Sequence, residues 1–438
     1  MREAAPARQE AAPLMSTGPR PSRVLSSSSL EMPGTLEMSP AGLFCPAGGF
    51  HIDPWRPVPR AVITHAHADH ARSGCGHYLC LSSGKRVLRE RVGASATIDT
   101  LRRGEQIRVG EVDLRLVPAG HILGAAQVCI THRGVRWVVT GDYKLEADPT
   151  CDPFEPVETD VLVTESTFGL PIYRWGDPQE TANAINAWWR ESREAGRTCV
   201  LFAYALGKAQ RLAAMLDPAI GPIYAHGAVM KMVRAYRDSG VRLPAIDQLA
   251  PATRRAGGGR AMVIAPPSAA GSRWLRTFGE TSVAMASGWM TIRGVRRRRG
   301  FDRGFVLSDH ADFPGLVQAV EASHARRVYV THGSAASFAR FLCERGIEAS
   351  ELATRFSGEE GSDEAASEES GGAEPGGAEP GGAEPGGAEP GGAEPGGAEP
   401  GGAEPGSAEP GGAEPGGAEP GGAEPGGAEP GQQQGEAS

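Results

Sequence analysis

Short apolar runs recur along the chain, and each leads through a turn to a polar side chain. The run at 112–117 alternates apolar and polar residues, as a half-buried strand does, and leads through Pro-Ala-Gly to His121. Four further runs predict strands that lead to similar side chains: 135–139 to Asp142, 161–163 to Glu165, 305–307 to His310 and 328–330 to His332. Each side chain alone is typical of an ordinary loop residue. As a set, they predict a reactive site in loops on one rim of a sheet layer.

The densest group of metal-competent side chains is the hexad His65-Ala66-His67-Ala68-Asp69-His70, directly after the apolar run 61–63. His65 and His67 are two residues apart, so on extended backbone they point the same way, and Asp69 with His70 can reach a second ion. Neutral imidazoles and a carboxylate suit zinc-like ions. A lone histidine is more often a core or surface residue, but clustered His and Asp rarely serve packing because unpaired burial is unfavourable.

Between residues 172 and 287 the candidate catalytic residues disappear and strands alternate with helices. Residues 180–189 predict an amphipathic helix, 198–203 a buried strand and 207–216 a second helix, and further strands are expected around 221–224 and 261–264. The pattern indicates a small α/β domain inserted into the main one. Lys208, at a helix start, can either contact a phosphate or lie solvated on the helix surface. Trp188 and Trp189 are expected in the core.

Three motifs together resemble the metallo-β-lactamase superfamily: His-x-His-x-Asp-His at 65–70, Gly-His at 120–121 and Thr-Gly-Asp at 140–142. Three others resemble its β-CASP nucleases: Thr-Glu-Ser-Thr-Phe-Gly around Glu165, Ser-Asp-His-Ala-Asp around His310 and Thr-His-Gly around His332. The segments 52–58, 288–290 and 303–313 are most similar to one bacterial branch, the ligase-associated DNA exonucleases. The resemblance covers residues 36–356.

This resemblance implies an α/β fold, a metallo-β-lactamase αββα sandwich carrying an inserted α/β β-CASP cap domain. The expected organisation has five segments: a disordered extension at 1–35, the first part of the sandwich at 36–171, the insert at 172–287, the second part of the sandwich at 288–356 and a disordered acidic tail at 357–438.

Carried over position by position, the resemblance also implies the roles of the site residues. The first zinc would be held by His65, His67 and His121. The second would be held by Asp69, His70 and His332, with Asp142 bridging the two. The catalytic group would comprise Asp69 together with Glu165 and His310, an acid/base pair in which the carboxylate orients the imidazole.

Asp53 would support a ligand histidine without binding metal itself, and a turn-capping role before Pro54 is the alternative. Two departures from the relatives' pattern affect this region. Ser334 follows Thr-His-Gly where several relatives carry Glu, and only a few residues separate Asp53 from the hexad.

The charge of the chain is divided between two opposite regions. The net charge is −9 overall, but residues 358–438 hold nineteen acidic side chains and no Lys or Arg, which leaves residues 1–357 with 44 basic against 34 acidic groups, a net of +10. A basic body suits a polyanion-binding enzyme. The run Arg296, Arg297, Arg298 and Arg299 is favoured as a backbone-phosphate clamp, with a solvated basic loop as the alternative.

Both ends of the chain have the composition of disordered segments. The first 35 residues are rich in Pro, Ser, Ala and Arg, and residues 371–430 form twelve pentapeptides, eleven of them Gly-Gly-Ala-Glu-Pro. Regular Pro and paired Gly disfavour helix and sheet, and little apolar surface opposes the ordering entropy. We expect the tail to be a flexible solubilising polymer, or alternatively a competitor of DNA for the basic surface.

The seven cysteines show no spacing typical of disulfides or metal knuckles, and the sequence contains neither a signal-peptide core nor an apolar stretch of 18 residues. These features predict reduced thiols, a cytoplasmic location and no membrane span.

Together these features predict a hydrolase with two divalent metal ions, zinc by ligand type or manganese, that cleaves phosphodiester bonds in DNA by a metal-activated hydroxide. The favoured role is a DNA exonuclease that trims ends, with DNA and an ATP-dependent DNA ligase as implied partners. The alternatives are an RNA-processing β-CASP ribonuclease, and a non-catalytic module of the same fold that binds DNA ends or a ligase.

Overall fold

The computed structural model describes residues 34–249, 260–292 and 300–354. Three features expected from the sequence therefore lie outside the described residues: nearly all of the extension at 1–35, the arginine run 296–299 and the acidic tail at 357–438. Within the described ranges, no helix is both long enough and apolar enough to cross a membrane.

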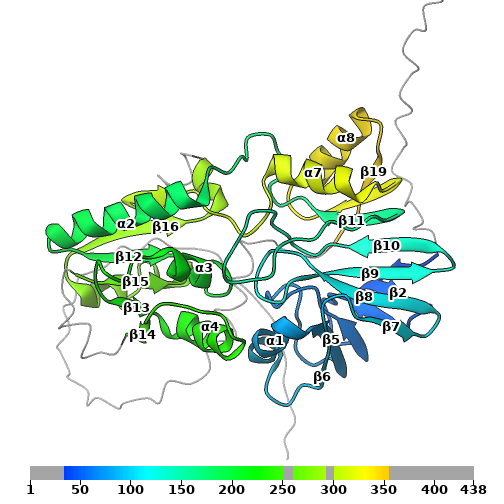
Figure 1. Ribbon diagram of the computed structural model, residues 1–438, viewed down its shortest axis with the longest axis horizontal. Helices are drawn as coiled ribbons and strands as arrows, with labels where there is room; N and C mark the ends of the chain where they lie inside the picture. Colours follow the sequence, from blue (N-terminus) through cyan, green and yellow to red (C-terminus); the bar gives the residue numbers. More distant parts are fainter. Residues whose placement is uncertain (1–33, 250–259, 293–299, 355–438) are drawn as a thin grey trace, which may run out of the picture. The chain divides into compact units, whose positions relative to one another are not determined.

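The first sheet has six strands in the order β1-β2-β3-β4-β5-β6. The strands β1 to β3 are antiparallel and β3 to β6 are parallel, with these bounds: β1 Glu37–Ser39, β2 Gly42–Cys45, β3 Phe50–Ile52, β4 Arg60–Val62, β5 His77–Leu81 and β6 Ile98–Leu101. A short 3₁₀ turn, η1 (Ser82–Gly84), and helix α1 (Lys85–Val92) follow β5. Figure 1 shows α1 beside β5 and β6.

The second sheet has seven strands in the order β19-β18-β11-β10-β9-β8-β7. Its bounds are β7 Gln106–Val109, β8 Val112–Pro118, β9 Ala126–His132, β10 Val135–Val139, β11 Val161–Glu165, β18 Arg327–Thr331 and β19 Glu348–Glu351. The strands from β7 to β10 are antiparallel, and those from β10 to β19 are parallel. The β9–β10 hairpin turns at Arg133-Gly134, both with positive φ, which is the conformation that a tight two-residue hairpin needs.

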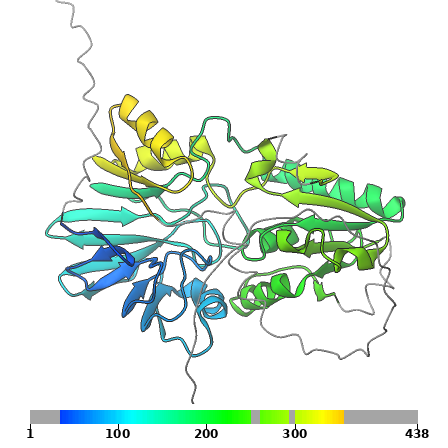
Figure 2. The same cartoon turned by 180° about the vertical axis from the view of Figure 1, so that it is seen from behind.

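The two sheets pack face to face through apolar side chains that alternate along their strands. Ile52 and Val62 of the first sheet share a buried cluster with Leu116 and Val128 of the second. The outward faces are covered by helices: α1 on the first sheet, and α7 (Phe313–Ser323) and α8 (Ala335–Glu344) on the second. These yellow helices lie along the second sheet in Figure 2. The predicted αββα sandwich is therefore confirmed.

The third sheet is formed by the inserted segment and is parallel throughout. Its order is β14-β13-β15-β12-β16-β17, with bounds β12 Thr198–Phe202, β13 Ile223–Ala225, β14 Asp247–Gln248, β15 Met262–Ala265, β16 Thr281–Ala286 and β17 Arg303–Phe305. Every residue of β12 and β15 is buried, as expected for a parallel sheet covered on both faces. Because β17 pairs with β16, the insert extends to Phe305 and not to the predicted boundary at 287.

Three helices cover one face of this sheet: α2 (Pro178–Glu194), α3 (Lys208–Met215) and α4 (Gly227–Asp238). Three 3₁₀ turns lie along the rest of the insert: η2 Pro267–Ala269, η3 Leu275–Phe278 and η4 Gly288–Thr291. Helix α2 begins at a capping Asp177, whose side chain accepts from the Gln179 amide. Trp188 and Trp189 of α2 are 1% and 0% exposed, so their predicted place in the core is confirmed.

Candidate metal centre

Strand register brings the predicted site residues to one rim of the sandwich. Glu165 ends β11 and pairs in register with Thr331 of β18, so His332 emerges beside it. Asp142 follows β10, whose Val139 is aligned with Val163 of β11. Because carboxyl ends of neighbouring parallel strands share an edge, residues distant in sequence come together. The hexad follows β4 in the facing sheet and reaches the same rim.

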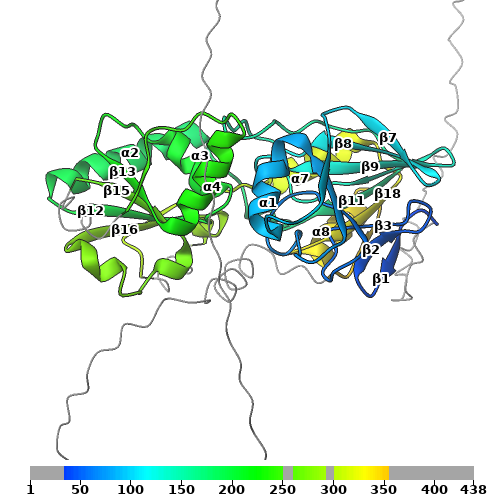
Figure 3. The ribbon, with the colours of Figure 1, turned by 90° about the horizontal axis from the view of Figure 1, so that it is seen from below.

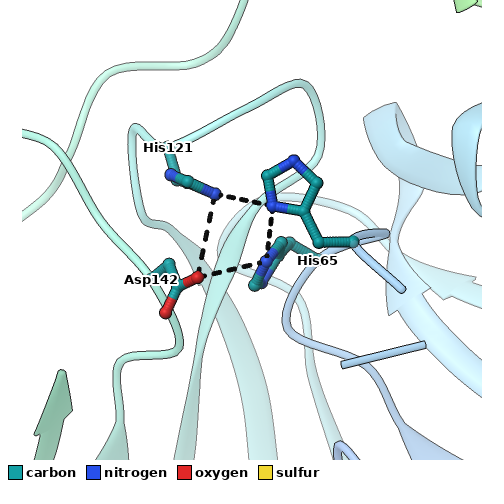
Figure 4. Close-up of side chains that lie close together, drawn as sticks. His65, His121 and Asp142 are labelled. Atoms are coloured by element: carbon teal, nitrogen blue, oxygen red, sulfur yellow. Dashed lines mark hydrogen bonds and ion pairs between the residues drawn. The ribbon is translucent and has the colours of Figure 1, made fainter. Parts of the chain in front are cut away.

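The first cluster contains His65, His67, His121 and Asp142, whose ligand atoms all lie within 4.8 Å of one another. His67 Nδ1 lies 3.1 Å from His65 Nε2 and 3.0 Å from His121 Nε2. Asp142 Oδ2 lies 3.4 Å from His65 Nε2 and 3.9 Å from His121 Nε2. In Figure 4 the three labelled side chains point toward a common centre.

The second cluster contains Asp69, His70 and His332, and it adjoins the first through Asp142. His70 Nε2 lies 3.7 Å from Asp69 Oδ2 and 3.6 Å from Asp142 Oδ2. The rings of His70 and His332 stack with their centroids 5.2 Å apart. The structure therefore brings all seven predicted ligands together, with Asp142 between the two groups.

Each imidazole in these clusters is oriented by a bond at its other nitrogen. His67 Nε2 donates to the Leu206 carbonyl at 3.2 Å, and His121 Nδ1 donates to the Asp309 carbonyl at 2.6 Å. His65 Nδ1 lies 3.1 Å from Thr64 Oγ1, which donates onward to a carboxylate and so accepts from the ring. His65, His67 and His121 therefore turn an unprotonated nitrogen toward the centre, as metal ligation requires.

His332 is held in the left-handed region, at φ 60°, between β18 and α8. Its Nδ1 lies 2.7 Å from Thr331 Oγ1, and its carbonyl accepts from Ser166 Oγ at 2.6 Å. Gly333 also has positive φ, and a Cβ there would lie 2.6 Å from the Ser166 carbonyl oxygen, so only glycine fits. Ser334, the next residue, donates its amide to that same carbonyl.

Asp53 supports His70 from behind the second cluster. Its Oδ2 accepts from His70 Nδ1 at 2.8 Å and from Thr64 Oγ1 at 2.5 Å, while its Oδ1 accepts from the Thr64 amide at 2.8 Å. The parallel β3–β4 pair brings Asp53 to Thr64 despite the short connection before the hexad. The carboxylate is committed to these groups and not to capping the turn at Pro54.

Burial determines the protonation states of most of these rings. It lowers the pKa of His65 and His121 well below the usual value, that of His67 to about 4 and that of His332 to about 3. These four imidazoles are therefore neutral at pH 7 and able to bind a cation. His70 behaves differently: burial lowers its pKa, but the surrounding carboxylates, led by Asp142, outweigh burial and raise it to about 10.

Glu165 and His310 form a buried pair beside the first cluster. His310 Nδ1 lies 2.9 Å from Glu165 Oε2, and both side chains are at most 2% exposed. Glu165 also accepts from the Tyr143 amide at 2.7 Å. Burial raises the pKa of Glu165, but His310 outweighs it and the net pKa is lowered, so the carboxylate is ionised. The ligand atoms of Asp142, Glu165 and His310 lie within 4.8 Å of one another.

The residues fit a pair of divalent cations. A tetrahedral zinc site with bonds of about 2.1 Å has ligand atoms about 3.4 Å apart, and the separations of 3.0–3.9 Å in the first cluster lie around that value. Asp142 is 5% exposed, and its Oδ1 has no hydrogen-bond partner among the described residues. A buried carboxylate oxygen of this kind is stabilised by a cation.

Lys208 lies neither at a phosphate-accessible surface nor in solvent, the two positions that the sequence predicts for it. It begins α3 but is 0% exposed, with its Nζ 4.6 Å above the Tyr204 ring. A solvated position on the helix is therefore wrong, and a fully buried amine cannot reach a nucleic-acid phosphate in this arrangement. Packing of α3 between its own sheet and the rim explains the difference. The Leu206 carbonyl just before α3 accepts from His67, and Gly207 packs against Ile122, the residue after His121.

A buried ionic network next to the rim was not foreseen from the sequence. Lys144, Asp148, Arg211 and Asp309 each have side chains at most 4% exposed. Arg211 Nη1 donates to the Ser308 carbonyl at 2.5 Å, and Lys144 Nζ donates to the His121 carbonyl at 3.0 Å. Single charged residues in loops and on a helix carry no pattern that marks them as buried, so only Asp309, within the His310 motif, had a recognisable sequence context.

Comparisons with known proteins are in keeping with this architecture. No protein-family model matches the chain. It is 33% identical over 321 residues to a probable DNA ligase of Opitutus terrae, covering 73% of this chain and 31% of the ligase. It is 30% identical over 185 residues to cleavage and polyadenylation specificity factor 73 of Drosophila melanogaster (38% of this chain, 27% of the factor) and 33% identical over 124 residues to endoribonuclease YSH1 of Yarrowia lipolytica (27% and 14%).

The chain thus spans less than a third of the length of each of these relatives. A solved structure of a protein of unknown function from Enterococcus faecalis V583 is 12% identical, covers 68% of this chain and 79% of that one and has a TM-score of 0.48, too distant to carry an argument.

An αββα sandwich with an inserted parallel α/β domain, and with two adjoining His/Asp clusters on its rim, defines a metallo-hydrolase of the metallo-β-lactamase type. Its relatives and its Glu165–His310 pair then specify the group: the chain belongs to the β-CASP metallo-β-lactamase family. The family prediction is confirmed.

Proposed function

We propose that this chain is a metal-dependent DNA exonuclease that trims DNA ends in association with a DNA ligase. The observation that carries the proposal is the position of the buried Glu165–His310 pair within 4.8 Å of Asp142, which itself lies between the two ligand clusters. A proton donor beside a two-metal site is the arrangement that phosphodiester hydrolysis needs.

Two divalent ions, zinc by ligand type or manganese, would supply an activated water and neutralise charge on the phosphate. The first would be held by His65, His67 and His121, the second by Asp69, His70 and His332, and Asp142 would contact both. Asp69 would also face the reacting water, which gives it a catalytic role. Asp53 would keep His70 oriented.

His310 would protonate the leaving oxygen. Glu165 binds Nδ1 of the imidazole, which orients the ring and favours its charged form, so that Nε2 can donate as the P–O bond breaks. The pair is also enclosed by aromatic side chains: the Phe168 ring lies 6.0 Å from His310, and Trp175 Nε1 donates to the His310 carbonyl at 2.9 Å. Exclusion of water by these rings would strengthen the electrostatic interactions at the reacting phosphate.

The relatives support DNA over RNA as the substrate. The relative named a probable DNA ligase aligns with 73% of this chain, whereas the cleavage and polyadenylation specificity factor and the endoribonuclease align with 38% and 27%. An RNA-processing role is the second candidate, and the endoribonuclease name favours it. The ligase relative also supports the partner, because domains joined in one polypeptide in one organism often act together as separate chains in another.

End-labelled single- and double-stranded DNA and RNA of matched sequence would test this function. We expect chelator-sensitive shortening of DNA from an end and no shortening of RNA. His67→Ala should lose the activity, whereas His77→Ala should keep it, because His77 is an exposed histidine paired with Asp99. Cleavage of RNA alone would establish the second candidate. A protein with full metal content that cleaves neither strand would be a non-catalytic module.

A further inference from the structure

A basic pocket lies at the start of α1, outside the metal centre. It has a volume of about 370 Å³ and is lined by Ser82, Ser83, Lys85, Arg86, Arg89 and Ser239. We call it the α1 pocket. Five of these residues belong to η1 and α1 of the sandwich, and Ser239 is the C-cap residue that follows α4 of the insert. Figure 3 shows α1 and α4 side by side, and Lys231 of α4 donates to the Glu90 carbonyl of α1 at 2.8 Å.

The cations of this pocket are not neutralised within the described part of the chain. Lys85 and Arg86 are exposed, and neither forms an ion pair with any described residue. The first turn of α1 contains no acidic residue. One carboxylate is near, since Ser83 Oγ donates to Asp152 at 3.1 Å. Arg89 donates to the Ala96 carbonyl and shapes the wall. Two positive charges therefore remain to attract an anion.

A second basic pocket, of about 510 Å³, differs in this respect. Its Arg103 pairs with Glu155 at 2.6 Å, and its Arg136 lies 3.8 Å from Glu158 and 3.4 Å from Asp160. Acidic side chains thus occupy two of the three guanidinium groups that line this pocket, those of Arg103 and Arg136, and leave Arg115. The larger pocket is the weaker candidate for an anion.

Contacts of η1 and α1 connect the α1 pocket with two of the three loops of the first cluster, the His121 loop and the hexad. Between the lining residues Ser83 and Lys85, the buried Gly84 packs directly on Gly124, where a Cβ would lie 2.0 Å from the Gly84 Cα. Gly124 is three residues beyond His121, so at most about 10 Å of extended chain joins this glycine contact to His121. At the other end of α1, Arg91 Nε donates to the Ala66 carbonyl inside the hexad at 3.3 Å. The helix is a rigid link between pocket and rim.

We propose that the α1 pocket binds a backbone phosphate of the same nucleic-acid strand whose end is hydrolysed at the metal rim. Lys85 and Arg86 contact the phosphate oxygens and Ser82 offers a further donor, a few nucleotides from the reacting bond. The proposal rests on the nuclease function above, and it assigns the pocket the role of holding the strand in register. Such contacts are independent of base sequence and are weakened by salt.

The test is the double variant Lys85→Ala/Arg86→Ala in the full chain, compared with Arg340→Ala/Arg345→Ala. The control also removes two positive charges. Its exposed Arg340 lies on α8 and pairs with Glu344, and Arg345 caps α8 and pairs with Glu321. Binding of labelled single-stranded DNA is measured by fluorescence anisotropy with chelator present, over a range of salt concentrations. We expect Kd to rise about 10- to 100-fold near 0.1 M salt, and the slope of log K against log salt to fall by about 1.5 to 2. The control should change little.

Three further results decide the matter. Unchanged Kd and slope in the pocket variant would overturn the proposal. Inorganic phosphate that displaces DNA at millimolar concentration, with Kd independent of strand length, would also overturn it in favour of a site for free phosphate. In the third result, the variant binds DNA more weakly and the wild-type protein hydrolyses no strand. That result would support the pocket and reject only the proposed nuclease function.

Discussion

Two buried polar regions lie against each other in this protein, the ionic network and the metal rim. Of the two, the ionic network is the one in which Lys and Arg side chains pair with carboxylates. In the ionic network, two cations face two carboxylates. Lys144 Nζ donates to the His121 carbonyl, to Asp148 and to Cys151 Sγ, which accounts for all three of its protons. Burial raises the pKa of Asp148, but Lys144 and Arg211 outweigh it, and the pKa is lowered. These four residues therefore balance one another's charges. Glu146, at the edge of the network, is the exception, because burial raises its pKa to about 7 and its Oε2 has no hydrogen-bond partner among the described residues.

The metal rim has the opposite character. The facing nitrogens of His65, His67 and His121 approach one another at 3.0–3.1 Å, and because the protons lie on the other nitrogens of these rings, the facing lone pairs repel unless a cation lies between them. Asp142 keeps one oxygen without a hydrogen bond among the described residues. Burial raises the pKa of Asp142 to about 7, which reflects how poorly the protein alone stabilises its charge. Comparison of the two regions thus distinguishes a buried cluster whose charges pair within the chain from one whose donor atoms are suited to bind cations.

The ionic network also positions residues of the metal rim. His121 is the residue they share: its carbonyl accepts from Lys144, and its Nδ1 donates to the Asp309 carbonyl. Arg211, on α3 of the insert, binds both the Ser308 carbonyl and Asp309 just before His310. The network therefore connects the insert to a predicted metal ligand and to the proton donor of the proposed mechanism.

The largest effect is expected when the rim loses its shared ligand. Asp142→Asn should lower activity by more than about 10⁴-fold, because metal ions supply several kcal/mol of transition-state stabilisation. Metal content, measured by plasma mass spectrometry, should fall below that of the wild type. Full metal content together with a wild-type rate would show that Asp142 is not the bridge. Asp113→Asn, a change on a half-exposed carboxylate of β8 that pairs with Arg108, is the matched control.

The next effect concerns the pair beside the rim. His310→Ala should keep the metal and lower kcat about 10²- to 10⁴-fold, the usual contribution of a general acid. Glu165→Gln should have a smaller effect in the same direction, because it keeps the shape but removes the charge that favours the imidazolium. Rates measured with a substrate whose leaving group needs no proton should be far less affected. If both substrates slowed equally, His310 would be a structural residue.

The sequence predicted the rim better than its surroundings, for physical reasons. The hexad and the residues after strands are local patterns, and strand register alone brings Glu165 and His332 together. The alternation of strands and helices predicted the inserted sheet, whereas the αββα sandwich was implied by the resemblance that the motifs carry. Lys208 was misplaced because burial of a lysine depends on what α3 packs against, and the limit of the insert was misjudged because the β16–β17 pairing is a tertiary contact.

A smaller effect is expected from the ionic network. Arg211→Ala should lower the free energy of unfolding by about 3–5 kcal/mol, because it leaves Asp148 and Asp309 buried with one cation fewer. Metal content should be retained, since no ligand is removed. Urea denaturation gives the free energy of unfolding, and Arg211→Lys should recover part of it. Loss of metal at unchanged stability would mean that the two regions are not distinct.

The smallest effect is a difference in proton release when metal is added. With His70 at a pKa of about 10 and Asp142 at about 7, metal must displace about one proton at pH 8, mainly from His70, while His67 and His332 are already neutral. Because protons compete with metal below these pKa values, apparent affinity should rise about tenfold per pH unit from pH 8 to 9, and this rise should end above pH 10.

Calorimetric titration with metal in buffers of different ionisation enthalpy measures the released protons directly. Asp53→Asn removes one of the carboxylates that raise the pKa of His70, so it should release fewer protons at pH 8. Asp148→Asn alters the ionic network without touching a ligand, so its proton release should match that of the wild type. If both variants changed the number of released protons equally, the network and the rim would titrate as one unit. The distinction between the ionic network and the metal rim would then be wrong.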